Sequence, residues 1–354
     1  MYSNKIVQED LKFIADQNIC WDRFRNKCVL VTGATGMLPS YIVFSLLYLN
    51  EVFPDINVTV VALARNNEKA KSVFKDVLDN PFFNLIIKDV CETFETKNKV
   101  DYIIHGASLA SSQYYGIDPV GVMLPNILGT YNLLEMAKKH EVEGFLFFSS
   151  NEIYGKVTET SIITEETCGT SDLLNIRNCY PESKRMGELM CTAWSLQHKV
   201  PAKSVRISHT YGPMMDVKND KRVFSSFVSD IINGRDIEIK SSGMAKRTFC
   251  YIADAVSAFL IILLNGEYGQ AYNMCGDDFI TINQLAKTLV DLVPNKKLKV
   301  ICTERDDNEV YIENKDASTI PTSNAKLKNL GWAPKYSVSS GFLRTINALS
   351  ERDV

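Results

Sequence analysis

Short apolar runs that alternate with helical stretches constrain the fold of this chain more than any other feature. Helical stretches follow several of these runs, and strands that alternate with helices form a parallel sheet with helices on both faces. We therefore predict an α/β fold, a doubly wound parallel sheet whose ligands bind at the carboxyl ends of its strands. The expected strands lie at 27–33, 57–65, 83–90, 100–108 and 144–150, and the helices between them at 39–50, 67–78 and 126–140.

The pattern loosens after Val205, where turn residues, short strands and helices mix. A mixed region of this kind is typical of a smaller α+β part that covers the open edge of the sheet. The expected domains are an N-terminal extension, 1–26, a sheet domain, 27–205 with 248–275, and a substrate-binding region, 206–247 with 276–354.

Charge and cysteine content narrow the class of function. A net charge of -3 over 354 residues gives no reason to expect nucleic acid or an anionic membrane as a partner. Nine cysteines lie scattered without a C-x-x-C pair, so we expect reduced thiols in a cytoplasmic protein, with neither a disulfide framework nor a metal site. The longest apolar runs, Tyr41–Leu49 and Ala255–Leu264, are too short to span a bilayer and fit buried helices.

A glycine-rich turn, Thr32–Gly36, follows the first apolar run. Gly33 and Gly36 would let the main chain turn tightly and approach a pyrophosphate at the N-terminus of the next helix, as in a Rossmann-type domain. Pro39 stands where the third glycine of that fingerprint is usual, and proline is tolerated in a first helical turn. A plain strand–turn–helix is the alternative. The cofactor contacts assigned to this turn are Gly33, Thr35, Gly36 and Met37.

Two further positions bear on the choice between NAD and NADP. The second strand ends at Arg65, with no acidic residue to bind the adenosine ribose, and an arginine there could meet a 2′-phosphate. This favours NADP, although a solvated arginine explains the residue almost as well. Asp89 and Val90 follow the third strand and could bind the adenine, or Asp89 could be an ordinary surface residue.

Tyr180 and Lys184 form the central pair of candidate catalytic residues. Side chains four apart lie on one face of a helix. An ammonium beside a phenol would lower the phenol pKa from about 10 toward neutrality, so that Tyr180 could take a proton from a sugar hydroxyl. Lys184 could also hold the nicotinamide ribose. The Y-x-x-x-K spacing is weak alone, because ordinary helix pairs share it.

The segment Phe148–Gly155 strengthens this interpretation because it ends an apolar strand with polar groups. The Ser150 hydroxyl could share the substrate hydrogen bond of Tyr180, unless Ser150 only caps a turn. Glu152 would add a second titratable group, which removal of a proton from the carbon beside a ketone requires. The alternative for Glu152 is a solvated carboxylate.

At this point the chain resembles an extended short-chain dehydrogenase/reductase of the nucleotide-sugar epimerase/dehydratase type. Within that family it is most similar to UDP-glucuronate decarboxylases, through residues 105–119, 206–215 and 221–223. The order Ser150-x-Glu152 also resembles nucleotide-sugar 4,6-dehydratases. The segments that carry the resemblance are TGATGMLPS, Asp89-Val90, HGAS, NILGTYNLLE, FFSSNEIYG, YPESK, RISHTYGP and RTFCYIADAV, in order from about 27 to 275.

The resemblance implies roles for several residues. Ser150, Tyr180 and Lys184 would be the catalytic trio, Asn126 would support the proton relay, and Glu152 would act in the second step. Each role has a structural alternative. Tyr115 and Asn126 could serve only in packing and in a helix hydrogen bond, and each of the two arginines, Arg222 and Arg247, could form a surface salt bridge. The implied substrate-binding residues are Tyr115, Ser150, Asn151, His209, Arg222 and Arg247, with the two arginines on the diphosphate, and Ala107 joins the cofactor set together with Tyr180 and Lys184.

Four positions depart from the family pattern. Pro39 replaces a glycine, the ribose acid is missing, His209 stands where asparagine is usual, and Asn151 occupies the place of a catalytic aspartate in some dehydratases. His209 could merely satisfy a main-chain hydrogen bond. The missing aspartate at 151 weakens the resemblance to that type of dehydratase.

The function expected is a cytoplasmic lyase of carbohydrate biosynthesis that acts on a nucleotide diphosphate sugar through a C4-keto intermediate, by decarboxylation or 4,6-dehydration. A nucleotide-sugar 4-epimerase or C4 oxidase is the second possibility, and a dinucleotide-binding sensor without turnover is the third. NAD or NADP would be tightly bound and recycled. The resemblance also implies a homodimer built from the helices at 120–140 and 180–198.

Overall fold

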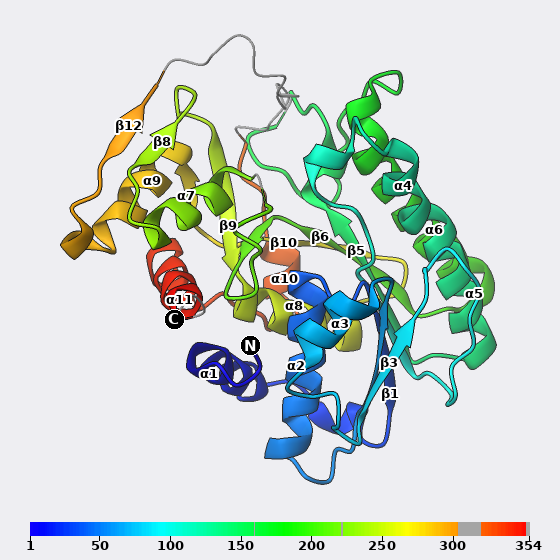
Figure 1. The fold of residues 1–354 in the computed structure, drawn as a ribbon. Coiled ribbons are helices and arrows are strands. Elements are labelled where there is room, and N and C mark those ends of the chain that lie inside the picture. Colours follow the sequence, from blue (N-terminus) through cyan, green and yellow to red (C-terminus); the bar gives the residue numbers. More distant parts are fainter. Residues whose placement is uncertain (159, 221, 304–319, 352–354) are drawn as a thin grey trace.

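Seven parallel strands form the central sheet in the order β10-β6-β5-β4-β1-β2-β3 (Figure 1). The computed structural model describes residues 1–158, 160–220, 222–303 and 320–351, so Lys221 and parts of the expected substrate-binding region lie outside the described residues. The predicted doubly wound parallel sheet is confirmed. The strands are β1 Cys28–Thr32, β2 Thr59–Ala64, β3 Phe83–Ile87, β4 Tyr102–His105, β5 Gly144–Ser150, β6 Ala202–Ile207 and β10 Ala271–Met274.

Helices cover both faces of this sheet, and the strands are apolar on both faces for that reason. In β5, Leu146 and Phe148 belong to the core cluster of α2 and α8, whereas Phe145 and Phe147 belong to the cluster of α5 and α6. The alternation follows the two-residue period of a strand. The helices around the sheet are α2 Met37–Val52, α3 Asn67–Phe74, α4 Pro119–Leu124, α5 Thr130–His140, α6 Cys179–His198 and α8 Ile252–Asn265.

The strand order reverses beside β1, which pairs with β2 on one side and with β4 on the other. Chain crossovers therefore leave in opposite directions from β1 and β4, and a ligand crevice opens at their carboxyl ends. A π-helical turn, Pro125–Gly129, joins α4 to α5 on the same side of the sheet as α6. The order of the strands thus places the glycine turn and the end of β4 side by side.

A smaller region with two short sheets lies beside the central sheet (Figure 1). One sheet has the order β11-β9-β7, and the other pairs β12 with β8. Short strands and helices of this kind agree with the mixture expected after Val205. The elements of this region are β7 His209–Tyr211, α7 Val223–Ile232, β8 Ile237–Ile239, β9 Lys246–Tyr251, β11 Phe279–Thr281, α9 Ile282–Asp291, β12 Val300–Cys302, α10 Ala325–Lys328 and α11 Val338–Ser350.

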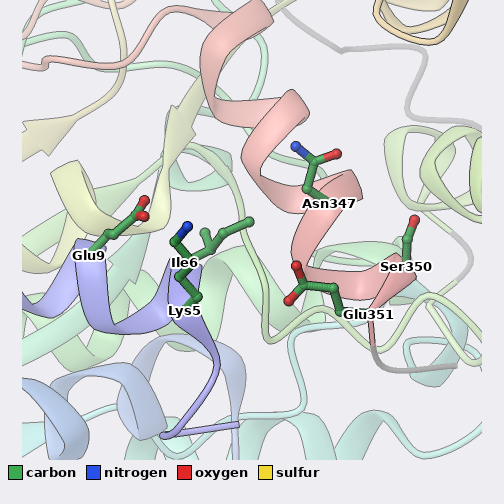
Figure 2. Close-up of a pocket in the computed structure, with 6 residues that line it drawn as sticks. All are labelled: Lys5, Ile6, Glu9, Asn347, Ser350 and Glu351. Carbon is green, nitrogen blue, oxygen red and sulfur yellow. The ribbon is translucent and has the colours of Figure 1, made fainter. Parts of the chain in front are cut away.

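Asp10 ties the N-terminal helix α1, Lys5–Ala15, to the body of the protein. The carboxylate is fully buried and accepts hydrogen bonds from the hydroxyls of Tyr41 and Tyr251, each at 2.6 Å, and from Arg344 Nη2 at 2.7 Å. These partners satisfy both carboxylate oxygens, as a buried charge requires. Figure 2 shows the hollow between α1 and α11, which is lined by Lys5, Ile6, Glu9, Asn347, Ser350 and Glu351.

Two sequence expectations about apolar runs and cysteines can be compared with the structure. Tyr41–Leu49 and Ala255–Leu264 lie inside α2 and α8, and nearly all of their residues are buried as predicted. In the part of the chain that the structure describes, no helix combines the length and the apolar character needed to cross a bilayer. All nine cysteines are free thiols, and five of them are buried.

Removal of the Asp10 carboxylate should destabilise the fold strongly. In Asp10→Ala the Arg344 guanidinium and two buried phenols lose their shared acceptor, and breaking a buried ion pair from one side costs about 3–5 kcal/mol. Urea unfolding measures the change, with Asp16→Ala at the exposed end of α1 as the matched control. A change below about 1 kcal/mol in Asp10→Ala would contradict this role.

Candidate active site

The glycine turn between β1 and α2 has the shape that a dinucleotide requires. Gly33 adopts φ +64°, and a Cβ atom there would lie 2.6 Å from the Ala107 Cα atom, so no other residue fits. Gly36 is the N-cap of α2, and no side chain caps this helix or places an acidic group in its first turn. The first main-chain N–H groups of α2 and its positive dipole end therefore suit an anion such as a pyrophosphate.

Pro39 does not disrupt the turn, and the structure explains why. A Cβ atom on Gly106, just after β4, would lie 2.7 Å from the Pro39 Cγ atom. The missing side chain at Gly106 thus makes room for the pyrrolidine ring at the helix–strand contact. Thr35 lies in the turn and Met37 is the first residue of α2, whereas Ala107 N–H donates to the Thr32 hydroxyl at 3.3 Å. The residues present fit a bound dinucleotide.

Arg65 and Asp89 lie at the ends of the neighbouring strands β2 and β3, where they pair with each other. Arg65 Nη1 is 3.7 Å from Asp89 Oδ2, and Asp89 Oδ1 accepts from Cys91 N–H at 2.8 Å. The arginine charge that was interpreted as a sign of NADP is therefore already partly compensated. Val90 is buried against Gly129, where an added Cβ atom would lie 2.8 Å from the Val90 Cγ1 atom.

Tyr180 and Lys184 lie on one face of α6, as their spacing predicts. Lys184 Nζ is 5.7 Å from the centre of the Tyr180 ring and donates a hydrogen bond to the Phe148 carbonyl at 2.6 Å. Both side chains are buried. The glycine turn ends β1, and this pair stands beside β5, two strands away in the same sheet. The candidate acid–base pair is therefore inside the protein and on the helix that packs on β5.

The effect expected of Lys184 on the phenol is wrong for this structure. Burial raises the pKa of Tyr180, the Glu152 charge raises it further, and a hydrogen bond with Ser150 and the charges of Arg222 and Arg177 lower it. These groups cause the largest shifts of the phenol pKa, and Lys184 is not one of them. Burial lowers the pKa of Lys184 itself to about 7. Removal from water thus outweighs the pairing that the sequence suggested.

Ser150 and Asn126 combine a structural contact with a position in the site. Ser150 Oγ accepts from Glu152 N–H at 3.2 Å, which is the turn-capping role left open above, and Ser150 is also one of the groups that lower the pKa of the Tyr180 phenol. Asn126 lies in the π-helical turn and donates to Val122 O at 3.0 Å and to Ser183 Oγ at 2.9 Å. Its Oδ1 atom is buried and has no partner among the described residues, so it can still accept a hydrogen bond.

Glu152 meets a cation that was not predicted. Arg177, just before α6, donates from Nη2 to Glu152 Oε2 at 2.8 Å, and its guanidinium lies 5.2 Å from the centre of the Tyr115 ring. The Tyr115 ring in turn stacks on Tyr180, with centroids 5.2 Å apart and an interplanar angle of 13°. Tyr115 therefore stands against the phenol, and Asn151 begins the short helical turn that carries Glu152.

His209, Arg222 and Arg247 come together at the edge of the smaller region. The His209 ring lies 5.8 Å from each of the rings of Phe224 and Phe249. Burial, together with smaller effects of the Arg247 and Arg222 charges, lowers the pKa of His209 to about 3. Arg222 also pairs with Asp220 at 2.6 Å and acts on the Tyr180 phenol, so it links the two groups of side chains. Lys221 lies outside the described residues.

His105 is a second buried group that the sequence argument passed over. Its Nε2 atom lies 3.1 Å from the Pro125 carbonyl, which can only accept, so Nε2 carries the proton and Nδ1 accepts from the Thr32 hydroxyl at 2.8 Å. Burial lowers the pKa of His105 to about 3, with a smaller effect of Lys184. His105 thus connects the strand before the glycine turn to the π-helical turn that holds Asn126.

Comparison with known proteins gives one family. Residues 29–275 match the model of the NAD dependent epimerase/dehydratase family. Among curated relatives, UDP-glucuronic acid decarboxylase 3 of Arabidopsis thaliana is 31% identical over 317 residues, which cover 89% of this chain and 87% of that protein. The dTDP-D-glucose 4,6-dehydratase of Mus musculus is 27% identical over 327 residues, which cover 90% of this chain and 88% of that protein.

A solved structure shows the same fold. The UDP-glucuronic acid 4-epimerase of Bacillus cereus, in complex with UDP-glucuronic acid and NAD, superimposes with a TM-score of 0.75 at 20% identity. The match covers 92% of this chain and 99% of that chain. The names of these three proteins indicate three different reactions, a decarboxylation, a 4,6-dehydration and a 4-epimerisation.

The buried ammonium of Lys184 should make stability depend on pH. An unfolded lysine titrates near 10.4, so between about pH 7 and about pH 10 the unfolded chain binds one more proton, and the free energy of unfolding rises with pH by about 1.4 kcal/mol per unit. Lys184→Met should remove this increment in urea unfolding at several pH values.

Lys203 allows the same prediction to be tested at a second buried lysine. Burial also lowers the pKa of Lys203 to about 7, and its ammonium donates to the Leu263 carbonyl on the α8 side of the sheet. Lys203→Met should flatten the pH dependence to a similar degree. Equal slopes in the wild type and in Lys184→Met would contradict the prediction.

Proposed function

The chain belongs to the NAD-dependent epimerase/dehydratase family, and on this premise we propose that it is a nucleotide-sugar decarboxylase or 4,6-dehydratase. One observation carries the proposal: Ser150, Glu152 and Tyr180 meet at the carboxyl end of β5, with Lys184 on the same helix as the phenol. Sugar oxidation needs the phenol and the hydroxyl, and only a second proton transfer beside the ketone needs the carboxylate.

NAD is the cofactor that this site would hold. Its pyrophosphate would lie at the N-terminus of α2, held by Gly33, Thr35, Gly36 and Met37. Lys184 would hold the nicotinamide ribose. The adenosine side and the floor of the crevice at the carboxyl ends of the strands would be lined by Asp89, Val90 and Ala107. Bound there, NAD would supply reversible hydride transfer at C4 of the sugar.

The side chains of the protein would direct the protons. Tyr180, once ionised to the phenolate, would take the proton of the sugar 4-hydroxyl, and Ser150 would share the hydrogen bond of that hydroxyl. The carbonyl formed at C4 acidifies the neighbouring C5 position. In loss of water, Glu152, which lies near the phenol, would take the C5 proton and return it to the departing C6 hydroxyl. In loss of carbon dioxide, the electrons of the broken C5–C6 bond would pass to the C4 carbonyl, and protonated Glu152 would deliver a proton to C5.

The substrate would span the two regions of the protein. We assign the sheet domain to the cofactor and residues 206–247 with 276–354 to the nucleotide sugar. The charges of Arg222 and Arg247 both act on His209, and this pair of neighbouring cations supports our assignment of the two arginines to the diphosphate. Tyr115, stacked on Tyr180, would line the sugar pocket with Asn151.

A second copy of the chain is the partner that we propose. Apolar side chains are exposed in two helical stripes on the side of the sheet that carries α6, and a twofold axis would bury each stripe against its symmetry mate. The stripes consist of Val120, Leu124, Leu128 and Tyr131 on the α4–α5 segment and of Met186, Leu189 and Leu196 on α6.

Product analysis tests the proposed reaction. Mass spectrometry of UDP-glucuronate and dTDP-glucose after incubation with the enzyme should show loss of carbon dioxide or of water from one of them. Tyr180→Phe should lower kcat by about 10²–10⁴-fold with the dinucleotide still bound, and Glu152→Gln should form the 4-keto sugar but little final product. Tyr268→Phe, an exposed tyrosine, is the control.

The outcomes separate the alternatives. Unchanged turnover in Tyr180→Phe would remove the catalytic assignment of the phenol. Full activity of Glu152→Gln would point to an epimerase or a C4 oxidase. A protein that binds dinucleotide and converts no nucleotide sugar would be a sensor.

Disruption of the α6 stripe should dissociate the dimer. Leu189→Glu places a charge in the proposed apolar contact, so light scattering after size exclusion should give the monomer mass. Leu173→Glu changes a leucine outside the stripes that is even more exposed than Leu189 and should leave the dimer intact. A wild-type protein that is monomeric at micromolar concentration would contradict this assembly.

A further inference from the structure

Arg177 connects the two candidate proton-transfer groups although it has no role in the proposal above. Its guanidinium donates to the Glu152 carboxylate at 2.8 Å and lies over the Tyr115 ring at 5.2 Å. Tyr115 is stacked between this guanidinium and the Tyr180 phenol. Arg177 therefore belongs to a continuous chain of contacts, Glu152–Arg177–Tyr115–Tyr180.

The environment of Arg177 makes its charge important. Its side chain is 11% exposed, against 31% for Glu152, so the cation is mostly removed from water and depends on the carboxylate. Burial alone would lower the pKa of Arg177, but the Glu152 carboxylate raises it. A pair in such surroundings is screened less than a surface pair, and loss of one partner leaves an uncompensated charge.

The charges that face the phenol come from several elements. Glu152 comes from the turn after β5, Arg177 from the turn before α6, and Arg222 from the start of α7, whereas Ser150 offers a hydroxyl. Glu152 itself faces Arg177, Tyr115, Tyr180 and the Cys179 thiol. Of these groups, Glu152 makes the phenol harder to ionise, and Arg177 and Arg222 make it easier.

We propose that Arg177 is a positioning residue that holds the Glu152 carboxylate and cancels its negative charge at the Tyr180 phenol. This inference rests on the proposed function, in which Tyr180 must lose a proton while an anion stands beside it. Without Arg177, the carboxylate needed for the second step would oppose the first. The cation lets one site hold both groups.

Four proteins test the proposal: the wild type, Glu152→Gln, Arg177→Gln and the double variant. Tyrosine labelled with ¹³C at Cζ reports phenol ionisation by NMR in the NAD-loaded enzyme, and the Tyr180 signal is identified by its loss in Tyr180→Phe. The phenol should ionise at the lowest pH in Glu152→Gln and at the highest in Arg177→Gln, about one unit or more apart. The double variant should lie close to the wild type.

Kinetics give the second readout. The acidic limb of kcat against pH should move in the same order, and Arg177→Lys, which restores the charge, should recover most of the shift. Arg25→Gln, which breaks an exposed pair with Asp22, should change neither readout.

Specific results would overturn the inference. One is an identical Tyr180 signal in all four proteins at every pH. Another is an Arg177→Gln variant in which the acidic limb of kcat against pH is unshifted and KM rises only for sugars that carry a carboxylate. Arg177 would then be a direct substrate ligand. A wild type without turnover would remove the proposed function, and the NMR comparison would still decide the role of Arg177.

Discussion

A single buried ammonium joins the two elements on which the candidate active site depends. Lys184 of α6 donates to the main-chain carbonyl of Phe148 in β5 at 2.6 Å, and water does not reach either group. An unpaired ammonium in such a place is unfavourable, so the helix cannot slide along the strand without losing this bond. Tyr180, one turn earlier on α6, and Ser150, two residues later on β5, are held together in consequence.

Burial, more than pairing, determines the electrostatics around this contact. The pKa of Lys184 falls to about 7, those of His105 and His209 fall to about 3, and that of Tyr180 rises, each chiefly because the charged form loses water. Neutral forms are therefore favoured throughout the interior of the site. Glu152 and Arg177 form an ion pair there, with Arg177 Nη2 at 2.8 Å from Glu152 Oε2. Such an interior strengthens every remaining charge–charge interaction.

The sequence predicted the sheet and the position of Tyr180 and Lys184 on one face of a helix well, and it predicted the pKa shift of the phenol poorly. Runs such as Gly144–Ser150 are apolar on both faces, and such a run in a βα pattern fits only a covered parallel strand. Strands of three residues, such as β7 and β11, carry too short a pattern to recognise. The pKa error at Tyr180 has a different origin, because spacing along a helix says nothing about how much water reaches a side chain.

Arg177 and His105 were missed for related reasons. Arg177 lies in a short turn, and its contact with Glu152 joins residues 25 apart in the chain. His105 ends an apolar strand, where a lone histidine is more often a packing residue, and its hydrogen bonds reach Thr32 and Pro125 from separate elements. Contacts of this kind depend on strand order and on the π-helical turn, which local patterns do not encode.

The contact between Pro39 and Gly106 also limits which substitutions the glycine turn can tolerate. A side chain at 106 would collide with the pyrrolidine ring, so the proline is compatible only with a glycine on the neighbouring strand end. The Thr32 carbonyl oxygen and the Phe148 ring also lie 3.2 and 3.3 Å from that Cβ position, so replacing the proline alone would not make room for a large residue at 106.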